Sequence, residues 1–145
     1  MFCFRSVSSY KEVTESRVQK DINERLEKRI SLYNNGKVDE AIKDIDVYDA
    51  VSYSTVLNDE NLVFLNDLAF YLEKENPTAS ALILEKILAK YPNRMVAKLN
   101  LADAYWAILE GNSPKIKQLY QEYKETMIPK GLAKKIPARV FERTE

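Results

Sequence analysis

Few residue types in this chain can carry out covalent chemistry. The 145 residues include no histidine, which excludes Ser-His-Asp and Cys-His catalytic arrangements and every His-ligated zinc or iron site. The one cysteine, Cys3, can form neither an internal disulfide nor a thiolate cluster. With three glycines, the chain has no Gly-rich loop to hold a phosphate. We therefore expect a binding module that is not an enzyme and takes no cofactor or metal.

Carboxylates are the first candidates for binding. Asp39, Asp46 and Asp49 are spaced i, i+7 and i+10 in a helix predicted over 38–51, so they are expected on one stripe. Residues 36–60 carry seven acidic and two basic side chains, a net charge of −5. The stripe lacks the loop and glycine of a calcium site. It is either a solvated acidic face or a face for a protein partner, and we take its three residues as candidate partner contacts.

The cations gather at the other end of the sequence. Residues 111–145 hold eight basic and four acidic side chains, whereas the whole chain has 22 of each. Five of these cations, Lys130, Lys134, Lys135, Arg139 and Arg143, fall within 14 residues. Helix C-termini favour cations through the helix dipole alone, and the net charge is zero. The sequence therefore predicts no nucleic-acid partner.

The remaining candidates depend on the elements that position them. Apolar residues recur at helical spacing almost everywhere, which predicts long helices over 9–33, 38–51, 60–74, 79–91, 94–110 and 114–127, with short turns at 132–135 and 138–143. Residues 52–59 are expected to be a loop or a short strand. Residues 1–20 are expected to be either a helix or an extended arm.

The ends of these helices carry local signals. Gly36 suits a left-handed C-cap after the first helix. Asp59, Thr78 and Ser113 are the expected N-caps of the third, fourth and sixth helices. Pro114 follows Ser113 at the favoured first helical position.

Two helix pairs repeat at a period of about 33 residues, which is typical of a solenoid. In 60–91, the small pair Leu68-Ala69 precedes Leu72 by three residues, and Pro92 closes the unit. In 94–127, Leu101-Ala102 precedes Tyr105, and Tyr120 provides the second-helix aromatic. Both units resemble the tetratricopeptide repeat. The segment 35–42 is similar to its usual turn, although Lys28 and Arg29 stand where the first small pair belongs.

The resemblance implies an all-α, tetratricopeptide-like array of about three helix pairs. It corresponds to a single domain over 1–145, with an N-terminal arm or helix at 1–20, repeats over 21–127 and a C-terminal extension over 128–145. The small residues Ala69 and Ala102 would let neighbouring helices approach closely, and the large residues Leu72 and Tyr105 would fill the adjacent space.

In such arrays the first helix of each pair lines a concave groove. Exposed aromatics flanked by polar groups are typical of interface anchors, and Phe70 and Trp106 are expected to be such residues. The alternative for Trp106 is packing under a neighbouring helix or the C-terminal tail. The groove is expected to be acidic and aromatic, without the cations that clamp a peptide carboxylate, which favours a basic partner. The groove positions are Asn66, Phe70, Glu73, Leu99, Asp103 and Trp106, with Asn100 and Glu110 beside them.

A narrower resemblance involves Leu68-Ala69-Phe70, Pro92-Asn93-Arg94, the run 99–106 and the run 134–140. These segments are similar to small bacterial repeat proteins, among them immunity proteins of contact-dependent growth inhibition. This resemblance implies a cytoplasmic immunity protein that neutralises a cognate toxin domain, expected to be a basic nuclease, by occluding its active site.

Two other classes of function stay open. One is a scaffold or adaptor that binds an extended peptide in the groove. The other is a solenoid that self-associates through residues 1–7 or through an open end. The N-terminal residues lack the apolar core of a signal peptide, and the apolar run 79–88 is interrupted by Glu85 and Lys86. We expect a cytoplasmic protein with no membrane contact that is a monomer or weak oligomer when free, with Cys3 packed as a small apolar residue.

Overall fold

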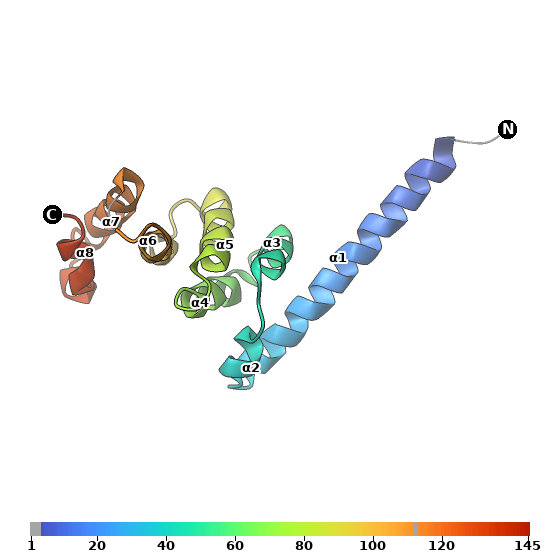
Figure 1. The fold of residues 1–145 in the computed structure, drawn as a ribbon, viewed down its shortest axis with the longest axis horizontal. Helices are drawn as coiled ribbons and strands as arrows, with labels where there is room; N and C mark the ends of the chain where they lie inside the picture. Colours follow the sequence, from blue (N-terminus) through green and yellow to red (C-terminus); the bar gives the residue numbers. More distant parts are fainter. Residues whose placement is uncertain (1–3, 112) are drawn as a thin grey trace. The chain divides into compact units, whose positions relative to one another are not determined.

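The computed structural model describes the backbone of residues 4–111 and 113–145 and the side chains of 16–111 and 113–145. Within these ranges the chain forms eight α-helices and one 3-10 turn, with no strand, which confirms the all-α prediction (Figure 1). The expected roles of Cys3 and of the apolar residues around it lie outside the described side chains. The chain divides into two compact units, residues 1–43 and 44–145.

The first unit consists of α1 (Phe4–Asn34) and α2 (Val38–Ile42). Within α1, Ile22 and Leu26, which are four residues apart, are buried. The turn after α1 forms through Gly36, whose φ of 79° lies in the left-handed region. Lys37 N–H donates to the Leu32 carbonyl at 2.9 Å, and Gly36 N–H donates to the next carbonyl at 3.0 Å. This pair of bonds is a Schellman motif, so the predicted C-cap is confirmed.

Arg29 fastens α2 onto α1. Its Nη1 donates to the carbonyls of Ala41 at 3.0 Å and Lys43 at 2.8 Å. The last carbonyls of a helix have no partner within the helix, so a guanidinium placed there satisfies them. The residue that departs from the repeat pattern therefore has a structural role of its own.

The predicted helix over 38–51 is wrong, because the chain leaves the helical conformation after Ile42. Asp44 takes a φ of 54°, in the left-handed region. A new helix, α3 (Val47–Thr55), then begins behind a capping box, in which Asp46 accepts from the Asp49 N–H at 2.8 Å. This reciprocal cap stabilises a separate helix start.

The loop or strand predicted over 52–59 is also wrong in its first half, because α3 continues to Thr55. Ala50 and Tyr53 are both buried, at helical spacing. The hydroxyl of Ser54 donates to the Ala50 carbonyl at 2.7 Å, which satisfies a polar side chain inside the helix.

Helices α4 (Leu62–Leu72) and α5 (Pro77–Lys90) pack against each other. Ser80 on α5 donates to the Ala69 carbonyl on α4 at 2.6 Å, and both residues are fully buried. The predicted caps of these helices are wrong. Asn76, not Thr78, caps α5 by accepting from the Ala79 N–H, since Pro77 occupies the first helical position. The cap position of α4 is Asn61 rather than Asp59.

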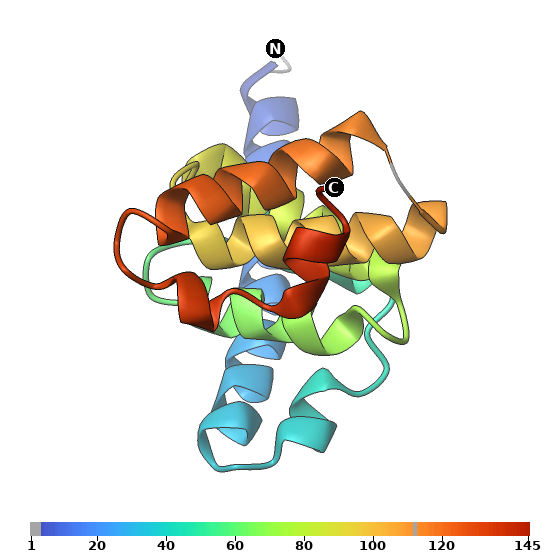
Figure 2. The same ribbon diagram turned by 90° about the vertical axis from the view of Figure 1, so that its left-hand side faces the viewer.

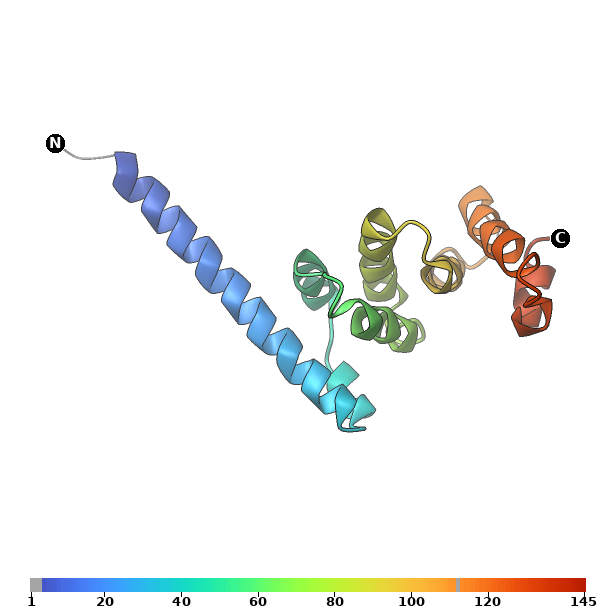
Figure 3. The ribbon, with the colours of Figure 1, turned by 180° about the vertical axis from the view of Figure 1, so that it is seen from behind.

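Helices α6 (Met95–Leu109) and α7 (Pro114–Met127) form the next packed pair. Ser113 accepts from the Ile116 N–H at 3.3 Å, which confirms it as the cap of α7. Helix α5 contacts α3, α4 and α6, and α6 contacts α7. The helices of the second unit therefore follow one another in an array, which Figure 3 shows from behind.

The C-terminal extension folds back onto this array. After a 3-10 turn at Ala133–Lys135, α8 (Ala138–Glu142) packs against α7. Val140 is fully buried and Ile136 nearly so. Figure 2 shows α8 lying over α6, on the side where α4 runs.

Candidate protein-binding surfaces

Four of the predicted groove residues meet in one pocket of about 210 Å³. Phe70 comes from α4, Glu73 directly follows it, and Asn100 and Asp103 come from α6. The pocket also takes in side chains that lie next in sequence or on the C-terminal extension, namely Lys74, Arg139 and Arg143. The structure therefore brings together, at one pocket, four residues that the sequence spacing assigned to the groove or beside it.

Contacts at two levels show that α4 and α6 run in the same direction. At the first level, Nε of Arg94, the residue before α6, donates to Oδ1 of Asn66 in the middle of α4 at 3.4 Å. At the second level, further along both helices, Glu73 just after α4 and Asp103 in the middle of α6 line the pocket just described. Asn66 itself is buried, with 2% of its surface exposed, so it supports the arrangement of helices and offers little surface to a partner.

Asp103 is the most heavily bonded side chain of the groove. Arg139 binds it with two parallel bonds, Nε to Oδ1 at 2.9 Å and Nη2 to Oδ2 at 2.7 Å. Arg143 Nη1 lies 3.3 Å from Oδ1, and the Tyr120 hydroxyl donates to the same oxygen at 2.5 Å. Such two-pronged guanidinium–carboxylate pairs combine strength with a fixed geometry. Because only 12% of its side chain is exposed, Asp103 serves the fold here.

Trp106 is also engaged by the extension. The Arg143 guanidinium carbon lies 4.2 Å from the centroid of the indole ring, within the range of a cation–π interaction. The same guanidinium donates to the Tyr120 hydroxyl at 2.6 Å. Trp106 thus lies under the C-terminal tail, as one of the two sequence alternatives had it.

The groove is not acidic, and that expectation is wrong. Its pocket contains two carboxylates, Glu73 and Asp103, against the three cations Lys74, Arg139 and Arg143. Burial, followed by the charge of Asp103, raises the pKa of Glu73, and the three cations partly oppose this. The missed signal was the i, i+4 spacing of Arg139 and Arg143, which puts both guanidinium groups on one side of a short helix.

The outer face of α4 exposes apolar side chains. Val63 and Phe70, two turns apart, are 57% and 56% exposed, and Tyr71 is 40% exposed. The Phe70 and Tyr71 rings meet edge to face, with centroids 5.4 Å apart. We call Val63, Phe70 and Tyr71 the α4 stripe. It borders the groove pocket through Phe70.

The predicted acidic stripe does not form, because its three residues are not on one helix. Asp39 belongs to α2 in the first unit, whereas Asp46 and Asp49 form the capping box of α3 in the second. Glu110 does not line the groove pocket either. It ends α6 with a φ of 48° and is exposed.

A broader acidic region replaces that stripe. From residue 44 to residue 73 the chain has seven carboxylates and no lysine or arginine. The same stretch exposes Val47, Tyr48 and Val51 on α3 together with the α4 stripe, and Tyr48 is 72% exposed. We call residues 44–73 the acidic segment. The sequence signal was the absence of bases rather than the spacing of acids.

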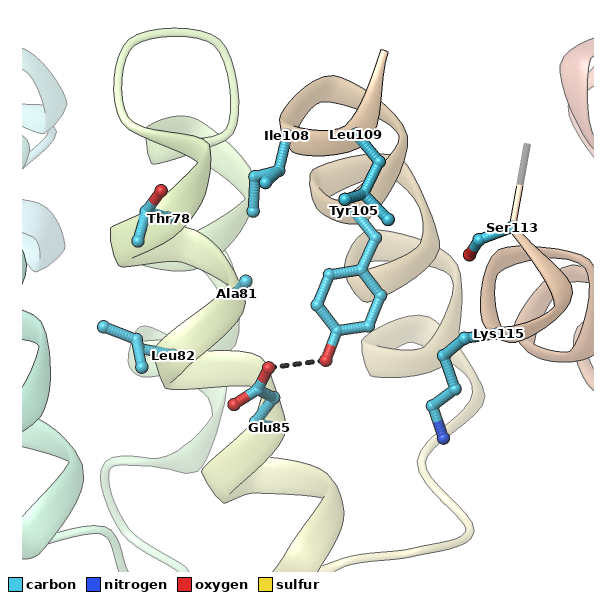
Figure 4. A pocket seen from close by; sticks show the side chains of 9 residues that line it. All are labelled: Thr78, Ala81, Leu82, Glu85, Tyr105, Ile108, Leu109, Ser113 and Lys115. Atoms are coloured by element: carbon cyan, nitrogen blue, oxygen red, sulfur yellow. Dashed lines mark hydrogen bonds between the residues drawn. The ribbon is translucent and has the colours of Figure 1, made fainter. Parts of the chain in front are cut away.

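A second pocket, of about 290 Å³, lies between α5 and α6 near the start of α7. Its lining includes the aliphatic side chains Ala81, Leu82, Ile108 and Leu109. The Tyr105 hydroxyl donates to Glu85 Oε1 at 2.5 Å (Figure 4). Burial and this hydrogen bond raise the pKa of Tyr105. From the sequence, Tyr105 was predicted to fill space between helices. The sequence signal for this pocket was the pair of apolar residues Ile108 and Leu109 next to a helix break.

Comparison of the chain with protein-family models, curated proteins and solved structures gave no significant match. Among the side chains that the structure describes, no group of three or more Cys, Asp or Glu residues is placed to hold a metal ion. No described helix combines the length and apolarity needed to cross a membrane.

Proposed function

We propose that the chain is a non-enzymatic protein-binding module built from tetratricopeptide-like helix pairs. Three features of the second unit support this architecture. Helices α4 and α6 run parallel, α5 contacts both of them, and the small residues Ala69 and Ala102 are fully buried where helices approach. Repeats of this kind present one helix of each pair to a partner.

The acidic segment is the observation that carries the proposal. Seven carboxylates without a base, next to six exposed large apolar side chains, combine long-range attraction for a cation-rich surface with apolar anchors for close contact. Electrostatic complementarity mainly speeds association and selects the partner, while aromatic anchors provide much of the affinity. The partner that fits this surface is a basic protein.

The specific function we propose is that of an immunity protein in the cytoplasm. The partner would be a toxin domain with a basic active site, such as a nuclease, whose polyanionic substrate requires cations. Covering that site with the acidic segment would exclude the substrate without any chemistry by this chain. This assignment follows the sequence resemblance at 68–70, 92–94, 99–106 and 134–140 together with the charge of the acidic segment.

Site-specific photo-cross-linking tests this function. A photoreactive residue is placed at Tyr48 or at Phe70, and in a control chain at Gln121, an exposed position on α7. We expect one basic protein to be cross-linked from both test positions and not from the control. That protein, expressed alone, should arrest growth, and co-expression of this chain should restore it. Equal cross-linking from Gln121, or a partner without toxicity, would contradict the proposal.

A second candidate is an adaptor that binds an extended peptide between α4 and α6. The pocket that gathers Phe70, Glu73 and Asn100 favours it. The two candidates separate by mutation, because an adaptor loses its ligand on Phe70→Ala but not on Tyr48→Ala, whereas a basic toxin domain loses affinity on both. A mass that rises with protein concentration, without any partner, would instead indicate a self-associating array.

A further inference from the structure

Part of the groove is already occupied, by the chain itself. Helix α8 lies over α6 on the side of α4 (Figure 2), and its two arginines line the groove pocket together with Phe70 and Glu73. Asp103 and Trp106, both predicted to contact a partner, are the residues that α8 uses. The contacts of α8 therefore show how the groove residues bind a segment that carries arginines.

The recognised pattern on α8 is short. Arg139 and Arg143, one helical turn apart, both bind Asp103, and Val140 between them is fully buried. Arg143 also stacks on Trp106. The Asp103 carboxylate and the face of the Trp106 ring bind the two arginines, and the buried position of Val140 accepts an aliphatic side chain. Together these groups favour a segment with arginines at i and i+4 and an aliphatic residue directly after the first.

Contacts with the other helices of the array stabilise the helical conformation of α8. A helix of five residues is unstable in water on its own, because nucleation costs more than so few hydrogen bonds return. Besides the groove, α7 also binds the end of the extension, because Lys124 Nζ donates to the Thr144 hydroxyl at 2.8 Å. An equivalent segment supplied by another protein would meet the same receptor groups.

Glu73 offers such a competitor a carboxylate that α8 influences electrostatically but does not bind directly. Its carboxylate lines the pocket but forms no hydrogen bond or ion pair with any residue that the structure describes. The Phe70 ring beside it is more than half exposed. A segment longer than α8 would add contacts to these two groups and so outcompete the intramolecular ligand.

We propose that the groove around Asp103 and Trp106 is a receptor for a basic helical segment of the partner, with two arginines four residues apart, and that α8 occupies this receptor until the partner's segment replaces it. The proposal rests on the proposed function for its basic partner, and it names the element recognised. The site then binds either α8 or the partner's segment, but not both at once.

A peptide copy of residues 136–145 is the probe, because α8 itself shows the binding mode. The receptor is opened in the full-length chain by Arg139→Ala/Val140→Ala/Arg143→Ala, and Trp106, the one tryptophan of the chain, reports binding by its fluorescence. We expect saturable binding to this variant and at least about ten-fold weaker binding to the native chain, where α8 competes. A peptide with both arginines replaced by alanine should not bind.

Two matched variants guard the interpretation. Lys134→Ala/Lys135→Ala removes the same charge from exposed positions of the extension and should behave as the native chain does. Arg143→Ala alone should give intermediate binding if the triple variant is too unstable by circular dichroism. Adding Asp103→Asn to either opened variant should abolish binding. No peptide binding to a folded opened variant would overturn the proposal and leave α8 as a fixed structural cap.

Hydrogen exchange separates this proposal from the proposed function. When the native chain binds the basic partner found by cross-linking, amide exchange in 138–142 should accelerate as α8 is displaced. A partner that cross-links from Phe70 while α8 stays protected would overturn the receptor and preserve the proposed function. A peptide that binds when no basic partner exists would preserve the receptor and refute the proposed function.

Discussion

The acidic segment (44–73) and the C-terminal stretch (114–145) carry opposite charge and use it differently. In the C-terminal stretch, Arg139 and Arg143 bind Asp103, and Lys124 binds Thr144. In the acidic segment, two carboxylates cap α3, and Glu60 and Glu73 form no side-chain ion pair with a described residue. The two arginines near the C-terminus are therefore used within the fold, whereas at least two carboxylates of the acidic segment, Glu60 and Glu73, are not.

This difference affects how a run of like charges in a sequence should be interpreted. A net charge in sequence indicates a binding surface only where the fold leaves the charges unpaired and places apolar side chains among them. The acidic segment has exposed apolar side chains among its carboxylates, and two of these, Glu60 and Glu73, form no ion pair with a described residue. The stretch around α8 does not meet the first condition, because Arg139 and Arg143 are paired with Asp103.

The largest expected effect is on stability, at Asp103. Replacing Asp103 by Asn leaves Arg139 and Arg143 without their carboxylate, and these guanidinium groups are 37% and 24% exposed. Since they are only partly desolvated, we expect a loss of about 2 kcal/mol, measured by urea unfolding. Glu60→Gln, in the acidic segment, should stay within about 0.5 kcal/mol. Equal losses would remove the contrast between the two regions.

The next effect concerns the start of α5. Asn76→Ala removes the side-chain oxygen that accepts from the Ala79 N–H, and a lost cap of this kind costs about 1 kcal/mol. Thr78→Ala should change the free energy of unfolding by less than about 0.5 kcal/mol. If Thr78→Ala proves the more damaging change, the assignment of Asn76 as the cap is wrong.

A pH effect follows at Tyr105 and Tyr120. Burial and a carboxylate hydrogen bond raise the pKa of both hydroxyls above the ordinary value of 10.0. The unfolded chain therefore loses these protons first. The stabilisation is complete below pH 10 and disappears as the pH rises through the folded-state pKa values. Absorbance titration of the phenolates should show late-titrating groups, because the pKa values of Tyr91 and Tyr123 are raised as well, and Tyr105→Phe should remove one of them.

The smallest effect is expected at an ion pair between α6 and α7. Lys98 lies 2.9 Å from Glu122 and lowers the pKa of that carboxyl. Its contribution is present above the unfolded value of 4.5 and is lost as the pH falls through the lower folded value. Because the pair is partly exposed, Glu122→Gln should cost no more than about 0.5 kcal/mol near neutral pH. A larger loss at pH 3 than at pH 7 would contradict this assignment.

Helical periodicity predicted most of the fold. It located α4 to α7 to within a few residues, and the paired spacings at Leu68-Ala69 and Leu101-Ala102 placed Phe70, Glu73, Asn100 and Asp103 at one pocket. These features are local or repeat at a fixed interval, so the sequence displays them directly.

Features that depend on distant residues were missed. Nothing near Asp103 shows that arginines 36 and 40 residues later would bind it. At the break between α2 and α3, Arg29 of another helix binds the carbonyls of Ala41 and Lys43. The helical reading of 38–51 failed there because periodicity alone does not register a capping box such as that of Asp46.

The central claim is that the acidic segment binds a basic partner. Its most direct test is the affinity of the cross-linked partner for two charge-altered chains, measured by calorimetry. We predict that Glu60→Lys/Phe70→Ala weakens binding more than about 30-fold. Lys130→Gln/Lys134→Gln/Lys135→Gln, three exposed positions of the extension, should leave the affinity within about two-fold. The opposite ranking would show that the partner binds the C-terminal extension and would contradict the claim.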